Sequence, residues 1–322
     1  MGRPPGLQSA EPGFAHEALM YAGISDFLAQ TVPFVADAVD AREPVLVALP
    51  QVRVGALRQA LGARADAVQF LHMEQVGRNP GRIISEWHRF VERRPDDGRP
   101  IRGIGEPIWV ERNPAELAQC HLHESLLNEA FEDTPGFTLL CPYDTAGLDA
   151  RTVDDARRTH PLIRREASSS TSAHYSPAAV RELHFREAFS PPPRDVRVVP
   201  ISGRTPQPPF AGLRRLVAEH ADSCGLTPPR VRDLVLAVHE VIVNAVQHDE
   251  HATLRLWREN DAAVCEVQNA ATLQDPMAGR RYPGHAALSG RGLWLTHQLC
   301  DLVQIRSTDY GTVVRLWVAA SR

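Results

Sequence analysis

The chain has 322 residues, 43% of them hydrophobic and 23% charged, with a formal net charge of -4. This length accommodates two domains of ordinary size, and the composition is that of a soluble globular protein. The basic residues are all arginine, and the slightly acidic balance argues against a large nucleic-acid surface. No apolar run reaches the roughly 18 residues that a membrane helix needs.

Residues 1–12 are polar and rich in proline and glycine, so we expect a disordered tail without a signal-peptide core. The five cysteines are odd in number and scattered: Cys120, Cys141, Cys224, Cys265 and Cys300. This arrangement argues against a disulfide framework and for a reducing, cytoplasmic location.

Residues 13–165 are predicted to form a first domain. Strand-like apolar runs occupy residues 18–21, 45–49, 68–71, 101–104 and 137–141. They alternate with helical patterns at 25–41, 51–62, 80–94, 114–132 and 149–158. Regular alternation of this kind predicts an α/β fold, in which a parallel sheet is covered by helices on both faces.

Ligands of parallel sheets usually bind at the carboxyl ends of the strands. The polar residues at those ends are Tyr21, His72, Glu106, Trp109, Tyr143 and Asp144. No Gly-x-x-x-x-Gly-Lys-[Ser/Thr] motif follows any strand, which excludes a phosphate-binding loop of that type. The first domain is therefore not expected to hydrolyse a nucleotide.

A metal site is an alternative for this domain. Cys120, His121 and His123 are close in sequence, and Cys141 is a further candidate ligand. Structural zinc normally requires two paired clusters of ligands, and only one tight cluster is present. Cys120 also fits the buried face of an ordinary helix, which is the favoured interpretation.

Four stretches resemble the MEDS sensory domain, which is related to the DcmR regulators. They are FAHEALMY at 14–21, GEPIW at 105–109, CHLHESLLN at 120–128 and CPYD at 141–144. The resemblance implies a RecA-like α/β fold that senses a small organic compound. The candidate sensory residues are then His16, Tyr21, His72, Glu106, Trp109 and Tyr143.

Residues 166–194 are rich in serine and proline and are expected to be a linker, with one short helix within 180–189. Two interpretations stay open. The segment is either a passive connector, or it docks between the domains and transmits a signal.

Residues 195–322 are expected to form a second domain. Strands are predicted at 197–201, 253–257, 264–267, 302–307 and 312–318, and helices at 209–224, 233–248 and 292–301. This order fits an α/β sandwich with helices on one face of a mixed sheet.

The second domain is organised around DLVLAVHEVIVNAVQH at 233–248. Its apolar residues recur at helical spacing, whereas Glu240, Asn244 and His248 recur every four residues. Residues four apart lie on one face of a helix, so the three side chains form one polar row. From the spacing alone, this row is either the wet edge of a core helix or a site for a metal and a polyanion.

Two later motifs follow this helix, SGRGLWL at 289–295 and YGTVVRLWV at 310–318. In this order the three motifs resemble the GHKL ATPase family, and EVIVNAVQH is most similar to the helix of RsbW-type anti-sigma-factor serine kinases. The resemblance implies a Bergerat-type α/β sandwich that binds ATP and Mg²⁺. It implies that Asn244 is a Mg²⁺ ligand, that Glu240 activates the acceptor hydroxyl, and that His248 faces the phosphates.

The same resemblance assigns ATP contacts to Gly290, Arg291, Gly292, Leu293, Gly311 and Thr312. Where the family has Asp-x-Gly for adenine, this chain has Asn269-Ala270-Ala271. Asn269 retains an acceptor oxygen for the adenine amino group, whereas Ala271 stiffens the turn.

The leading hypothesis is a cytoplasmic anti-sigma-factor-type serine/threonine kinase with an N-terminal sensory domain. Its implied partners are a sigma factor, a STAS-type antagonist and a second copy of the chain, and neither nucleic acid nor a membrane. The alternative is a catalytically degenerate module that regulates a partner by contact alone. A two-component histidine kinase is disfavoured, because residues 166–194 are too short to supply a phosphoacceptor hairpin.

Overall fold

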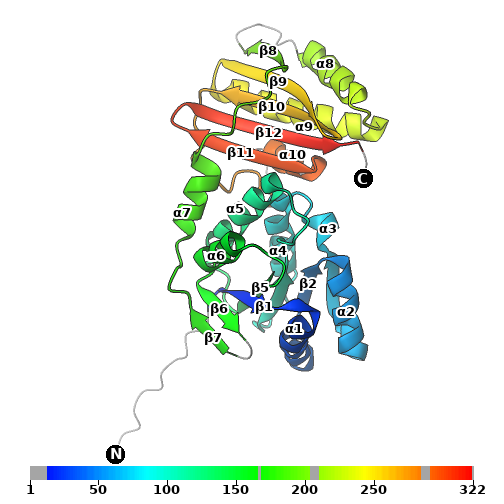
Figure 1. Ribbon diagram of the computed structural model, residues 1–322, viewed down its shortest axis with the longest axis vertical. Coiled ribbons are helices and arrows are strands. Elements are labelled where there is room, and N and C mark those ends of the chain that lie inside the picture. Colours follow the sequence, from blue (N-terminus) through cyan, green and yellow to red (C-terminus); the bar gives the residue numbers. More distant parts are fainter. Residues whose placement is uncertain (1–12, 166–167, 204–209, 284–290, 321–322) are drawn as a thin grey trace, which may run out of the picture.

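The computed structural model describes residues 13–165, 168–203, 210–283 and 291–320. They form two units of sheet and helix, stacked along the long axis of the molecule (Figure 1). None of the helices in these ranges is long and apolar enough to cross a membrane.

The first unit is built on a seven-stranded sheet of order β3-β2-β4-β5-β1-β6-β7. Its strands are β1 (Ala15–Tyr21), β2 (Val45–Leu49), β3 (Val68–His72), β4 (Ile101–Gly105), β5 (Phe137–Asp144), β6 (Leu162–Arg165) and β7 (Ser168–Thr171). All pairings are parallel except that of β6 with β7. The predicted parallel sheet is thus confirmed, with one antiparallel edge strand added to it.

Helices cover both faces of this sheet. They are α1 (Gly23–Asp40), α2 (Gln51–Leu61), α3 (Met73–Val76), α4 (Ile83–Glu92), α5 (Pro114–Phe131) and α6 (Ala150–Thr159), with the 3₁₀ turns η1 (Gly62–Ala67) and η2 (Pro80–Arg82). Helix α5 begins where the Asn-Pro pair predicts, because Asn113 and Glu116 form a reciprocal capping box. The central strand β2 is buried along its whole length, and β4 and β5 beside it are largely buried, which explains why they read as unbroken apolar runs.

The second unit has a five-stranded sheet of order β11-β12-β10-β9-β8. Its strands are β8 (Arg197–Ser202), β9 (His251–Glu259), β10 (Ala262–Asn269), β11 (Leu302–Thr308) and β12 (Gly311–Ala319). Every neighbouring pair is antiparallel, so the expectation of a mixed sheet was wrong. Tight hairpins join β9 to β10 and β11 to β12, and each one reverses the direction of the chain.

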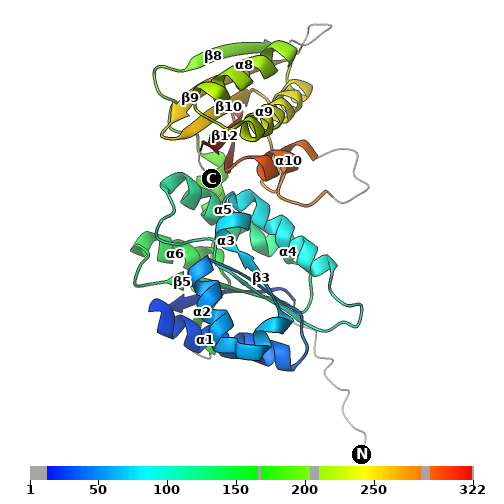
Figure 2. The same ribbon diagram turned by 90° about the vertical axis from the view of Figure 1, so that its right-hand side faces the viewer.

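Three helices lie on one face of this sheet: α8 (Phe210–Ser223), α9 (Pro228–His248) and α10 (Arg291–Leu299). Leu254, Cys265 and Leu316 point into the core beneath them, and one buried apolar cluster continues from this core into the first unit. Figure 2 shows α10 next to the helices of the first unit, at the boundary between the two.

The segment expected as a linker is largely ordered. It forms β7 in the first sheet, helix α7 (Pro177–Arg181) and a π-helical turn, η3 (Glu182–Arg186). Phe185 is buried, and Arg306 of β11 donates a hydrogen bond to the Leu183 carbonyl at 2.7 Å. Arg181 pairs with Glu129 of α5. The segment therefore packs against both units, which agrees with the docked interpretation and not with a passive connector.

Candidate nucleotide site and sensory residues

Helix α9 presents the polar row of the second unit. It begins after Thr227 with a proline at its first position, and its apolar face packs on the sheet. Asn244 and His248 line a pocket of about 250 Å³ between α9, β10, β12 and the segment that follows β10. The pocket brings together five predicted site residues: Asn244, His248, Asn269, Leu293 and Thr312.

Glu240 lies one helical turn before Asn244, against the first turn of α10. A β carbon placed on Gly292 would lie 2.9 Å from Oε2 of Glu240. Glycine at this position therefore lets the carboxylate and the start of α10 approach each other. Arg291 is exposed at the first position of α10 and is not among the residues that line the pocket. Gly290 lies outside the described residues.

The Asn269 amide lies at the edge of this pocket with a fixed orientation. Its Nδ2 donates to the Ala245 carbonyl at 3.0 Å, which requires the amide nitrogen to face α9. Oδ1 is therefore the atom that remains to accept a hydrogen bond. Asp249, directly after α9, accepts a hydrogen bond from the Ala270 backbone at 2.7 Å and so fixes the turn that follows β10.

Gly311 and Thr312 support the pocket wall. Thr312 Oγ1 donates to the Ala271 carbonyl at 2.8 Å and accepts from the Leu273 backbone at 3.0 Å. Gly311 has a φ of +114°, and a β carbon there would lie 2.0 Å from the Asn269 carbonyl oxygen. Thr312 lines the pocket, whereas Gly311 serves close packing behind it.

In the first unit, the structure joins two sensory candidates into one buried network. Tyr21 donates a hydrogen bond to Oε1 of Glu106 at 2.9 Å. Arg53 lies 3.2 Å from the same oxygen, 3.5 Å from Asp144 and 5.5 Å from the centroid of the Tyr21 ring. Arg53 was not among the predicted site residues, although its position in the first turn after β2 places it at the carboxyl edge of the sheet.

Four candidates lie elsewhere. His72 ends β3, and Trp109 stacks on Arg112 at 3.8 Å. Within the described chain, no hydrogen bond or ion pair joins either side chain to Tyr21, Arg53 or Glu106. His16 and Tyr143 are fully buried on the other side of the sheet, near His160. The expected single group of sensory residues is therefore divided into separate places.

The Cys120–His123 run does not converge on Cys141. Cys120 donates to the Pro107 carbonyl at 3.2 Å, and His121 stacks on His184 of the connector. Cys141 instead lies 3.4 Å from Nε2 of His16. A further pocket of about 760 Å³ opens at the amino ends of β1, β4 and β5, and none of the six sensory candidates lines it.

Burial raises the pKa of Glu106 to about 8, although Arg53 and the Tyr21 hydroxyl favour the carboxylate. The folded chain then holds a proton between about pH 4.5 and pH 8 that the unfolded chain has released. We therefore expect the free energy of unfolding to be highest below pH 4.5. It should fall by on the order of a few kcal/mol as the pH rises from 4.5 to 8, because the folded chain must then bury a carboxylate. Denaturant unfolding of the full chain at pH 5 and at pH 8.5 measures this difference. In Glu106→Gln, the free energy of unfolding should differ less between the two pH values than in the wild type.

The matched control for this measurement is Glu111→Gln. Glu111 is an exposed carboxylate just after the same segment. Its variant should keep the pH dependence of the wild type. If the free energy of unfolding of Glu106→Gln depended on pH as strongly as that of the wild type, Glu106 would not be the group responsible.

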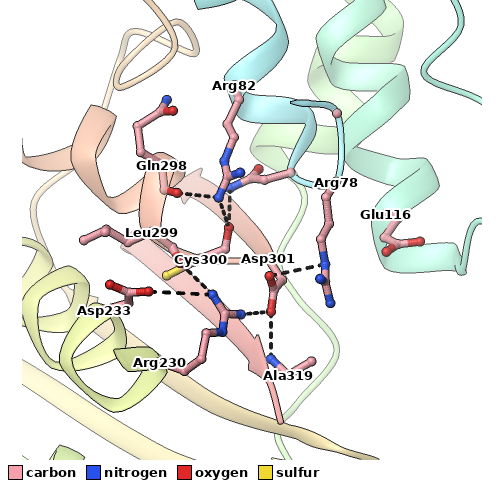
Figure 3. Close-up of polar contacts among 12 residues, drawn as sticks. Arg78, Arg82, Glu116, Arg230, Asp233, Gln298, Leu299, Cys300, Asp301 and Ala319 are labelled. Atoms are coloured by element: carbon pink, nitrogen blue, oxygen red, sulfur yellow. Dashed lines mark hydrogen bonds and ion pairs between the residues drawn. The ribbon is translucent and has the colours of Figure 1, made fainter. Parts of the chain in front are cut away.

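Helix α10, which contributes Leu293 to the pocket, is also held by the first unit. Figure 3 shows the polar contacts around its carboxyl end. Near its carboxyl end, the Arg82 guanidinium donates to the carbonyls of His297 at 2.7 Å, Cys300 at 3.0 Å and Gln298. Asn79 adds a hydrogen bond to the His297 carbonyl at 3.0 Å. These groups, from η2 and the residue before it, satisfy carbonyls that the end of a helix otherwise leaves unpaired.

Two further contacts cross the same boundary. Asp301, just after α10, pairs with Arg230 of α9 and, at 3.2 Å, with Arg78 of the first unit. Arg280 is fully buried in the segment that follows β10, and it donates a hydrogen bond to Gln119 of α5 at 2.7 Å. Helix α10 and the segment after β10, which both contribute residues to the pocket, are thus both held by the first unit.

Comparison with known families assigns a domain to each of the two units. The model of the histidine kinase-like ATPase domain matches residues 208–318. The model of the MEDS domain, the methanogen/methylotroph DcmR sensory domain, matches residues 15–161. The chain therefore carries a MEDS sensory domain followed by a histidine kinase-like ATPase domain.

No curated protein sequence matches the chain. Among solved structures, the RsbU and RsbW domains of Rv1364c from Mycobacterium tuberculosis match at 17% identity with a TM-score of 0.31. That match covers 40% of this chain and 34% of the other, so the chain spans about a third of that protein's length.

Proposed function

We propose that this chain is an ATP-binding regulator of the anti-sigma-factor serine/threonine kinase type, with residues 13–165 as its sensory domain and 195–322 as its kinase domain. The observation that carries the proposal is the pocket in which Asn244, His248 and Asn269 meet, with Glu240 one turn away against Gly292. The family match to a histidine kinase-like ATPase domain supports it. A sigma factor and a STAS-type antagonist are the proposed protein partners.

The residues present fit a Mg²⁺–ATP complex. The Asn244 amide lines the pocket and supplies an oxygen of the kind that Mg²⁺ prefers. Asn269 offers its Oδ1 to the adenine amino group. When bound, ATP would supply the phosphoryl group, and Mg²⁺ would neutralise its negative charge.

Glu240 acts on the acceptor in this proposal. Its carboxylate would accept the proton that a partner's serine hydroxyl loses as the serine oxygen attacks. His248 is exposed at the end of α9 and lines the pocket, where it would face the phosphates. These roles assign binding to Asn244 and proton transfer to Glu240, and the two are separable by experiment.

The contacts of α10 support regulation by the sensory domain. One short helix runs from Gly292, beside Glu240, to the carbonyls that Arg82 and Asn79 hold. A small organic ligand that shifts α4 or α5 would therefore move the start of α10 relative to Glu240. Regulation then requires only a small rigid-body displacement.

The test is Mg²⁺-dependent ATP binding by calorimetry on the full chain, followed by label transfer from ATP to STAS-type proteins. Asn244→Ala should abolish measurable binding. Glu240→Gln should retain binding and lower transfer by roughly 10²- to 10⁴-fold. Gln247→Ala removes an exposed amide from the same helix and should change neither ATP binding nor label transfer.

Absence of ATP binding in the wild type would overturn the kinase proposal. It would leave the alternative, a module that regulates its partner by contact alone. Binding without transfer to any antagonist would favour the same alternative.

A further inference from the structure

A second cluster of reactive side chains lies inside the first unit, away from the nucleotide pocket. His16 of β1, Glu124 of α5, Cys141 of β5 and His160, just after α6, each offer one ligand atom, and these atoms all lie within 4.8 Å of one another. All four residues are at most 1% exposed. Four separate elements thus converge on one point in the core.

The spacing of these atoms is that of a coordination shell. Oε2 of Glu124 lies 3.2 Å from Nε2 of His16 and 3.2 Å from Nε2 of His160, and Sγ of Cys141 lies 3.4 Å from Nε2 of His16. A tetrahedral Zn²⁺ ion with bonds of about 2.0–2.3 Å holds its ligand atoms about 3.3–3.8 Å apart. These three pairs lie within a few tenths of an ångström of that range, and the remaining pairs, at up to 4.8 Å, would draw in by up to roughly 1 Å around the ion.

The protons of this cluster also point to a cation. Nδ1 of His160 lies 2.8 Å from the Ala156 carbonyl, which only accepts, so Nδ1 carries the hydrogen. In the neutral ring, Nε2 then turns a lone pair toward Glu124. Across the described ranges, neither that nitrogen nor either carboxylate oxygen of Glu124 has a hydrogen-bond partner.

Converging lone pairs in a buried site cost free energy unless a proton or a metal ion lies between them. Histidines that bind a metal characteristically donate their other ring N–H to a backbone carbonyl, as His160 does to Ala156. A buried His160–Glu124 ion pair would add a second hydrogen, on Nε2, whereas a metal ion takes the Nε2 lone pair and leaves the Nδ1 hydrogen in place.

We propose that His16, Glu124, Cys141 and His160 bind one divalent transition-metal ion of the Zn²⁺ class. Two imidazoles, a thiolate and a carboxylate suit Zn²⁺, and four protein ligands complete its tetrahedral shell. A closed shell of this kind has a structural role: it joins β1, β5, α5 and the end of α6. The proposal is independent of the nucleotide site.

The experiment starts with elemental analysis of the full chain, purified without chelator. The metal is then stripped and the protein is titrated with Co²⁺, whose bond to a thiolate gives a charge-transfer absorption in the near ultraviolet. We expect one ion per chain and an absorption that saturates at one equivalent. Cys141→Ala should lose this absorption, and Cys120→Ala, which removes a buried thiol nearby on α5, should keep it.

The wild-type titration decides the outcome even where Cys141→Ala fails to fold. No uptake of Co²⁺ or Zn²⁺ at one equivalent, together with no rise in the unfolding temperature on adding Zn²⁺, would overturn the proposal. An absorption that persists in Cys141→Ala would also overturn it. Another first-row ion found at one per chain would support the site and identify its occupant.

Discussion

Gly311→Ala should destabilise the second domain by about 3–6 kcal/mol. The residue has a φ of +114°, which a side chain rarely adopts. The new methyl group would also lie 2.0 Å from the Asn269 carbonyl oxygen and 2.8 Å from the Ala270 Cα. Both are backbone atoms of the turn that shapes the nucleotide pocket, so relief of the clash would distort the pocket as well.

Gly212→Ala is the matched control for this substitution. Gly212 lies in α8, and a β carbon there meets nothing within 4 Å. Alanine should leave stability unchanged or raise it by about 0.5–1 kcal/mol, because it favours the helix. Denaturant unfolding of the two variants, with ATP affinity as a second readout, checks both expectations. A loss below about 1 kcal/mol in Gly311→Ala would contradict the close approach.

Arg82→Ala should release the carboxyl end of α10 from the sensory domain. The guanidinium donates to three carbonyls, those of His297, Gln298 and Cys300, and alanine leaves them without that partner. Charged hydrogen bonds of this kind contribute about 1.5–3 kcal/mol each, so local stability should fall by about 2–4 kcal/mol. Amide hydrogens of α10 should then exchange roughly 30- to 1,000-fold faster.

Hydrogen exchange followed by mass spectrometry measures this effect. Arg93→Ala, an exposed arginine just after α4, removes the same side chain without touching α10 and should leave the exchange unchanged. If α10 communicates with the sensory domain, ATP affinity should also change in Arg82→Ala and not in Arg93→Ala. Equal exchange in the two variants would exclude Arg82 as a clamp on α10.

The sequence itself determined the elements and the polar row of the nucleotide site. Buried parallel strands appear as unbroken apolar runs, and the spacing of Glu240, Asn244 and His248 needs only the helical period to place them on one face. These features are local, because they depend only on residues close together in the chain. Asn269 and Thr312 meet in the same pocket for a different reason: they are register partners of the antiparallel pair β10 and β12, which no hairpin joins.

Only the tertiary structure decided what meets across long separations. His16 and Cys141 are 125 residues apart and adjoin because β1 lies next to β5 in the sheet order. Arg82 and His297 are 215 residues apart and meet at the boundary of the two units. The same holds for Arg53 beside Glu106 and for the docking of the supposed linker. Contacts of this kind depend on strand order and on the packing of one unit against the other, which no local pattern of residues encodes.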